Sequence, residues 1–223
     1  MDAPNSAVLF DIDGTLVDST YHHAVAWHRA FARLDLTPPP LWRIHRAIGM
    51  GGDKLVAQLT SEEVEHAHGD DLRDWWRAEY LDLRAEVVAL AGASDVVRRL
   101  RAHGFRIALA SSGDPQFARE AVDLLGIGGD VEVLVTSEDV DASKPEPDLI
   151  GETLRRLNGA ERAVFVGDTV YDVEAAERAG IGCIGLRSGG FGSAELENAD
   201  AALVVDGPSD LVDLDWSPYL SSF

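Results

Sequence analysis

The chain reads Ala-Val-Leu-Phe-Asp-Ile-Asp-Gly-Thr at residues 7–15, an apolar run that ends in two carboxylates and a glycine. A short apolar run bounded by a turn residue is typical of a strand that is buried on both faces of a parallel sheet. Ligands of such sheets bind beyond the carboxyl ends of the strands. The stretch therefore predicts a strand that delivers Asp11 and Asp13 to a ligand site.

Further apolar runs recur along the chain, at residues 105–110, 131–135, 163–166, 181–186 and 201–205. Segments with helical spacing separate most of them, at residues 94–102, 115–125, 148–157 and 170–179. Strands that alternate with helices predict a parallel sheet covered on both faces. We therefore expect an α/β fold with a Rossmann-like, three-layer core.

Residues 18 to about 90 interrupt this alternation, because they show helical spacing throughout. The expected helices cover residues 20–34, 40–47, 52–59 and 70–88. A sheet of this kind needs no such block between its first and second strands. We therefore predict a core domain formed by residues 1–17 and 90–223, and a helical cap domain formed by residues 18–89.

The composition of the 223 residues describes a globular protein with a formal net charge of −20. This charge argues against nucleic acid and anionic membranes as partners, because both would be repelled. The single cysteine, Cys183, fits a reducing cytoplasm, and the acidic start at residues 1–6 does not resemble a signal peptide. We expect a cytoplasmic protein; its oligomeric state is not indicated.

Polar residues follow several predicted strands. Ser111 follows the run at 105–110, and Asp168 follows the run at 163–166, with Asp172 close behind it. Lys144 is one of only two lysines in the chain. Carboxylates crowded together with one lysine need a cation, and all-oxygen ligands suit Mg²⁺. The sequence therefore predicts a magnesium site, with Asp11, Asp13, Asp168 and Asp172 as the candidate ligands.

These residue types also suit phosphoryl transfer. A cation that neutralises the repulsion between a carboxylate and a phosphate would let Asp11 attack phosphorus. Asp13 lies two residues further on and is placed to protonate the leaving oxygen and later to activate water. Ser111 and Ser112, together with Lys144, are candidates to hold the phosphoryl oxygens.

The chain resembles the haloacid dehalogenase superfamily over nearly its whole length. The segments that carry the resemblance are Asp11–Thr15, Ser111, Lys144 in residues 143–148, and residues 167–172. The resemblance implies a small helical cap and a metal held by the carboxylate of Asp11, the main-chain carbonyl of Asp13 and the carboxylate of Asp168. It places Asp172 either next to the metal through water or against Lys144.

Within this superfamily the residues favour a Mg²⁺-dependent phosphatase that acts on a small phosphorylated metabolite. Dehalogenases and phosphonatases lack the acid that Asp13 supplies. A β-phosphoglucomutase-like sugar phosphomutase is the alternative, but those mutases carry Glu-Asp where this chain has Gly167-Asp168, and they lack an acid at the position of Asp172. A non-catalytic relative that binds a phosphorylated ligand is a further alternative.

Two residues of the predicted cap are candidates for substrate contact. Lys54 follows a glycine-rich loop that would allow a ligand to approach the backbone. His23 lies on the first cap helix and matches a histidine of the resembling mutases, although a hydrogen-bonding role at the hinge is the competing interpretation. The cap determines which ester is bound, so the substrate cannot be read from the core motifs.

Overall fold

The computed structural model describes residues 5–34 and 36–223. Residues 1–4, with which the predicted core domain and the acidic start begin, lie outside the described part. Within these ranges the main sheet has seven strands, and its central order is β5-β4-β1-β6-β7-β8. The parallel strands are β1 (Ser6–Phe10), β4 (Arg106–Ala110), β5 (Val133–Val135), β6 (Arg162–Gly167), β7 (Gly182–Leu186) and β8 (Leu203–Val205).

The observed sheet confirms the six predicted strands and the parallel α/β fold. The seventh strand, β9 (Ser221–Ser222), pairs antiparallel with β6 and was not predicted, because two serines carry no strand pattern. β1 lies between β4 and β6, with Leu9 in register with Ala108 and Phe165. This central position explains why every residue of β1 is buried.

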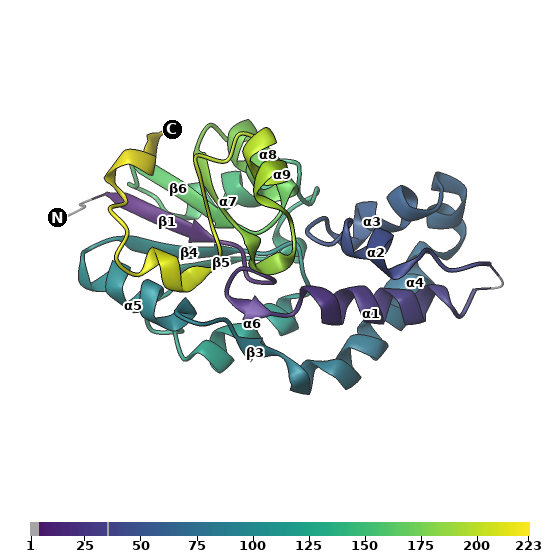
Figure 1. Ribbon diagram of the computed structural model, residues 1–223. Helices are drawn as coiled ribbons and strands as arrows, with labels where there is room; N and C mark the ends of the chain where they lie inside the picture. The colour runs from purple at the N-terminus through teal and green to yellow at the C-terminus, as the bar shows by residue number, and fades with distance from the viewer. Residues whose placement is uncertain (1–4, 35) are drawn as a thin grey trace.

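Helices cover both faces of the sheet, as Figure 1 shows. On one face, α5 (Ala93–Ala102) and α6 (Pro115–Leu125) pack in a core that contains Val8 and Phe10 of β1. On the other face, α7 (Asp148–Arg156), α8 (Val170–Arg178) and α9 (Ser193–Asn198) pack in a core that contains Ala7 and Leu9. The alternation along β1 divides its side chains between the two cores, which confirms the three-layer arrangement.

The remaining helices, α1 (Thr20–Phe31), α2 (Leu41–His45), α3 (Gly52–Leu59) and α4 (Glu62–Leu83), lie beyond one end of the sheet (Figure 1) and are here called the helical cap. Trp27, Leu55 and Leu72 belong to its separate apolar core. A two-strand pair, β2 (Val17–Asp18) and β3 (Val88–Ala89), joins the chain segments that enter and leave the cap. The domain boundaries at residues 17 and 90 stay a prediction.

The last cap helix differs from the prediction of residues 70–88, because α4 begins at Glu62 and ends at Leu83. The side chain of Ser61 accepts a hydrogen bond from the amide of Val64 and caps the helix, and three glutamates follow in the first turn, where the helix dipole favours acids. After Leu83 the chain turns into a 3₁₀ helix and then pairs as β3, so residues 84–88 leave the α-helix.

Short 3₁₀ helices complete the described elements: η1 (Arg84–Glu86), η2 (Ser137–Asp139), η3 (Arg187–Gly189), η4 (Pro208–Leu211) and η5 (Ser217–Tyr219). Among the helices of the described ranges, none combines the length and the apolar character needed to cross a membrane.

Candidate active site

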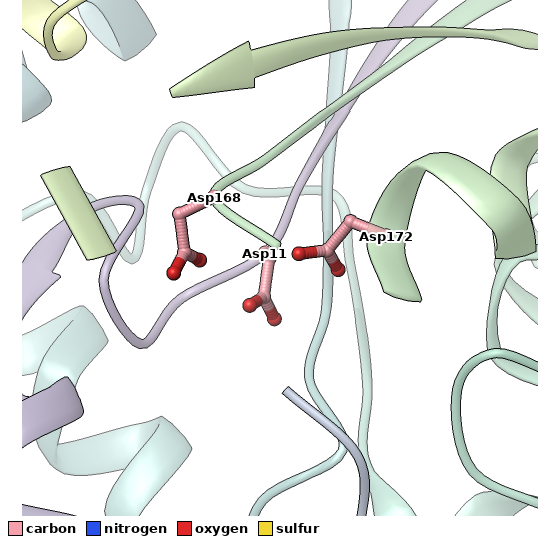
Figure 2. Close-up of side chains that lie close together, drawn as sticks. All are labelled: Asp11, Asp168 and Asp172. Atoms are coloured by element: carbon pink, nitrogen blue, oxygen red, sulfur yellow. The ribbon is translucent and has the colours of Figure 1, made fainter. Parts of the chain in front are cut away.

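The chain brings four separate segments together at the carboxyl ends of the central strands. Asp11 follows β1, Asp168 follows β6, and Asp172 lies in the first turn of α8. The carboxylates of these three residues each offer an oxygen within 4.8 Å of the others, and Figure 2 shows Asp11 drawn between the other two. All three side chains are buried. The predicted convergence of Asp11, Asp168 and Asp172 is thus present in the structure.

Lys144 is the cation of this cluster. Its Nζ lies 2.7 Å from Oδ1 of Asp11 and 2.8 Å from Oδ1 of Asp172, and its side chain is 1% exposed. Burial alone would lower the pKa of Lys144, but the two carboxylates outweigh it and raise the pKa. The lysine therefore stays charged while it faces the nucleophile candidate.

The carboxylate of Asp172 is occupied on both oxygens. Oδ2 accepts from the amide of Thr169 at 3.0 Å and from its hydroxyl at 2.7 Å, while Oδ1 faces Lys144. This arrangement fixes the N-terminus of α8 and the lysine at once. We therefore interpret Asp172 as a residue that positions Lys144, rather than as a direct metal ligand.

Asp168 has the opposite character. Its Oδ1 accepts from the hydroxyl of Thr15 at 3.0 Å, whereas its buried Oδ2 has no hydrogen-bond partner among the described residues. A Cβ added at Gly14 would lie 2.5 Å from this oxygen, and one added at Gly189 would lie 1.6 Å from it. The two glycines therefore let the backbone approach the carboxylate closely.

The charge of the cluster fits a divalent cation. Burial raises the pKa of Asp11 to about 7, although Lys144 opposes the shift. Burial also raises the pKa of Asp168, with Asp172 and Asp11 adding to the effect. Buried carboxylates with raised pKa values and an unpartnered oxygen are the groups that a hard cation stabilises.

Asp13 lies in a different environment, turned toward the cap. Its Oδ1 accepts from the hydroxyl of Ser19 at 2.5 Å and lies 3.0 Å from Nε2 of His23. Burial would raise the pKa of Asp13, but His23 and Ser19 outweigh it and lower the pKa. Asp11 and Asp13 are two residues apart, yet their pKa values move in opposite directions, which is a pattern typical of paired catalytic carboxylates.

The two predicted serines follow β4. Ser111 is buried, and its hydroxyl accepts from the amide of Gly113 at 3.0 Å. The hydroxyl of Ser112 is buried without a partner among the described residues. Asp114 caps α6 by accepting from the amide of Gln116, and Pro115 occupies the first helical position. The start of α6 therefore lies beside the serines.

A cavity of about 570 Å³ lies over these groups, between the sheet and the cap. Its lining includes Asp11, Asp13, Ser111, Ser112 and Asp168 from the core. His23, Trp27, Trp76, Arg73 and Arg77 line it from the cap.

Lys54 is not brought to this cavity. Its Nζ donates to the main-chain carbonyl of Ser143 at 2.6 Å and lies 3.8 Å from a carboxylate oxygen of Glu146. The ammonium group of Lys54 joins the cap to the loop that carries Lys144. Substrate contact by Lys54 stays a prediction. His23 does line the cavity, and its contact is with Asp13.

The residue before Asp168 excludes a side chain. A Cβ at Gly167 would lie 2.4 Å from Cγ and 2.5 Å from Cβ of Asp172. Asp172 can therefore occupy this position because residue 167 has no side chain. The glutamate that the resembling mutases carry at the first position does not fit beside Asp172 in this arrangement.

Sequence reasoning missed several contributors to the site. Thr15 and Ser19 lie in or next to the first motif, so their hydroxyls were candidates on position alone. Gly189, Arg73 and Arg77 carry no local signal, because only the fold brings them to the cavity or to Asp168.

Comparison with known proteins agrees with this geometry. A family model of haloacid dehalogenase-like hydrolases matches residues 6–180. A phosphoglycolate phosphatase from Pseudomonas putida is 30% identical over 205 residues, which cover 89% of this chain and 75% of that protein. A hydrolase from Pseudomonas syringae superposes with a TM-score of 0.87 at 32% identity, covering 93% of this chain and 96% of that one.

A more distant structure shares the fold. A candidate β-phosphoglucomutase from Thermotoga maritima superposes with a TM-score of 0.68 at 24% identity, covering 93% of this chain and 97% of that one. At this identity the likeness concerns the architecture alone, so it does not separate hydrolysis from mutase chemistry.

Proposed function

Since the chain belongs to the haloacid dehalogenase-like hydrolase family, we propose that it is a magnesium-dependent phosphatase that hydrolyses a small phosphate monoester through a phospho-aspartyl intermediate on Asp11. The observation that carries the proposal is the position of Asp11. Its carboxylate is buried beside Lys144 and Asp168 and lines the cavity that Asp13 also lines.

In the first step, an oxygen of Asp11 forms a bond to phosphorus while the bond from phosphorus to the ester oxygen breaks. Asp13 in its protonated form gives the leaving oxygen its proton, so the alcohol departs neutral. Lys144 and the hydroxyls of Ser111 and Ser112 hold the phosphoryl oxygens.

In the second step, water attacks phosphorus and the bond to Asp11 breaks. Asp13, now ionised, accepts the proton of the water, and inorganic phosphate is released. The lowered pKa of Asp13 suits its role as a base in this step. His23 and Ser19 hold its carboxylate in place.

The residues that would hold Mg²⁺ are Asp11 and Asp168 with their carboxylates and Asp13 with its main-chain carbonyl. The unpartnered Oδ2 of Asp168 supports this assignment. A bound Mg²⁺ would neutralise the charge between the nucleophile and the phosphate. Asp172, a candidate ligand by its place in the sequence, is proposed instead to fix Lys144.

The proposal extends to the setting of the enzyme. We place it in the cytoplasm, because its one cysteine, Cys183, is a buried free thiol. Its partner is a small phosphorylated metabolite and neither nucleic acid nor a membrane, since the net charge of −20 repels polyanions. The coupling of Gly167 to Asp172 supports hydrolysis over the mutase reaction.

The test is phosphate release from an aryl phosphate and a panel of phosphorylated metabolites, with and without Mg²⁺. Asp11→Asn should reduce kcat by more than about 10⁴-fold, because it removes the nucleophile. Asp123→Asn, at an exposed position on α6, is the matched control and should leave the rate unchanged.

Two outcomes would contradict the proposal. Retained ligand binding without release of phosphate from any ester would indicate a non-catalytic relative. Conversion of a hexose 1-phosphate to the 6-phosphate, with no free sugar formed, would indicate a mutase.

A further inference from the structure

The charges that line the cavity are strongly unbalanced. Beyond the catalytic carboxylates, the lining acids are Asp53, Glu65, Asp74, Asp114, Glu138 and Asp141. The lining arginines are Arg73 and Arg77 alone. A group that a substrate carries into this cavity therefore meets many more acids than bases.

Arg73 is bound by acids of its own helix. Its Nη1 donates to Glu65 at 2.8 Å and to the main-chain carbonyl of Gly52 at 2.9 Å, and its Nη2 donates to Asp70 at 2.9 Å. These bonds hold both terminal nitrogens. Arg73 is therefore neutralised before any substrate enters.

Arg77 is bound across the cavity to the core. Its Nη1 donates to Asp114 at 2.6 Å, its Nη2 donates to the side chain of Gln116 at 2.6 Å, and its guanidinium lies over the ring of Phe117. The remaining basic group of the lining, His23, faces Asp13. Every basic side chain that lines the cavity, within the described ranges, is paired with an acid.

Three of the acids have no such partner. Asp74, Glu138 and Asp141 are exposed residues of the lining, and none of them has an ion pair or side-chain hydrogen bond in the described structure. A carboxylate on the substrate would approach these charges without a free cation to receive it. Like charges that are not compensated disfavour binding.

From these observations we infer that this enzyme accepts phosphate esters whose leaving group carries no carboxylate, and that esters bearing one, such as 2-phosphoglycolate, are discriminated against. This inference rests on the proposed function and adds the class of leaving group to it. The volume of about 570 Å³ agrees, because cavities of this size hold ligands much larger than a two-carbon acid. It sets this chain apart from relatives that are named for phosphoglycolate.

The first test compares esters that differ only in one terminal group. These are 2-hydroxyethyl phosphate, 2-phosphoglycolate and O-phosphoethanolamine, assayed with glycerol 1-phosphate and an aryl phosphate on the full chain with Mg²⁺. The hydroxyl esters should exceed 2-phosphoglycolate in kcat/KM by about tenfold or more, which corresponds to the cost of one uncompensated charge.

The outcomes are distinguishable. A kcat/KM for 2-phosphoglycolate equal to or above that of 2-hydroxyethyl phosphate would overturn the inference and leave the proposed function intact. A kcat/KM for O-phosphoethanolamine at or below that for 2-phosphoglycolate would show that the charge of the terminal group does not decide the preference, and would overturn the inference as well. Failure to release phosphate from any ester, the aryl phosphate included, would overturn the proposed function itself.

The second test changes one charge of the lining. Asp74→Asn removes an acid that has no partner in the described structure, so folding should be unaffected. The ratio of kcat/KM for 2-phosphoglycolate to that for 2-hydroxyethyl phosphate should rise about threefold, the effect of one unit charge at a separation of about 7 Å in a water-like dielectric. Asp71→Asn, on the same helix but outside the lining, is the matched control. An equal ratio in both variants would contradict the inference.

Discussion

Nε2 of His23 lies 3.0 Å from Oδ1 of Asp13, so a residue of the helical cap contacts the proposed acid and base of the core. The imidazole is held in place by stacking on Tyr80, with 4.0 Å between ring centroids. His23 belongs to α1 and Tyr80 to α4, so two cap helices fix this contact. The position of the cap and the ionisation of Asp13 are thereby linked.

Replacing His23 with glutamine should move the acidic limb of the kcat profile to higher pH. His23 lowers the pKa of Asp13, so its removal raises that pKa, and the ionised base needed for the second step forms only at higher pH. Phosphate release measured from pH 4 to 9 tests this. His22→Gln is the control, because His22 has no contact with Asp13. An unchanged acidic limb would show that Asp13 is not the titrating base.

Replacing Asp168 with asparagine should raise the Mg²⁺ concentration for half-maximal activity by about 100-fold or more, because a charged ligand is lost. Thr15→Val, which removes only the hydrogen bond to Asp168, should have a smaller effect of about tenfold. Thermal shift titrations with Mg²⁺ give an independent measure of binding. Equal Mg²⁺ dependence in all three proteins would exclude Asp168 as a ligand.

Stability without metal should fall as the pH rises from 5 to 8. The pKa of Asp11 is about 7 in the folded state and near 3.8 in the unfolded state, so in this interval the folded state binds a proton that the unfolded state has lost. Asp168 shifts in the same direction. The melting temperature in a chelator should therefore decrease over this range, and the gain from added Mg²⁺ should be larger at pH 8.

A shallower slope is expected for Asp11→Asn, which removes one of the titrating groups. A melting temperature in chelator that is flat or rises toward pH 8, in both the parent and this variant, would contradict the raised pKa values of Asp11 and Asp168.

Gly167→Ala should destabilise the protein by about 1–3 kcal/mol, because the added Cβ would lie 2.4 Å from Cγ of Asp172 and force the packed site to move. Chemical denaturation measures the loss. Gly151→Ala on α7 is the control: a Cβ there meets nothing within 4 Å, and alanine should add up to about 1 kcal/mol through helix propensity. Similar changes for the two variants would show that the site relaxes around residue 167.

Most strands and helices of the core could be predicted from the sequence. In a chain of alternating strands and helices, apolar runs such as 7–12 indicate buried strands. Gly126 ends α6 with a φ of 63°, in the left-handed region that favours glycine. Short strands and the ends of helices were harder to predict from the sequence. β9 pairs through backbone groups alone, and the start of α4 depends on the cap formed by Ser61.

The residues of the candidate site also differ in how well the sequence predicts their positions. Asp11, Ser111 and Asp168 follow strands of one sheet, so their convergence follows from topology. Lys54 illustrates the limit: a glycine-rich loop before a lysine suggested ligand contact, but the partner of its Nζ is Ser143, 89 residues away. Such pairing depends on how the cap meets the core, which no local pattern encodes.

Ser143 is a core residue that binds three residues of the cap. Its hydroxyl donates to Asp53 at 2.5 Å and accepts from the amide of Gly51 at 3.1 Å, and its carbonyl receives the bond from Lys54. The next residue in the chain is Lys144. A cap that lifts away must break all of these bonds beside the lysine that faces the nucleophile. The product could then leave only when these hydrogen bonds of Ser143 break. The rate at which they break would therefore limit the turnover rate.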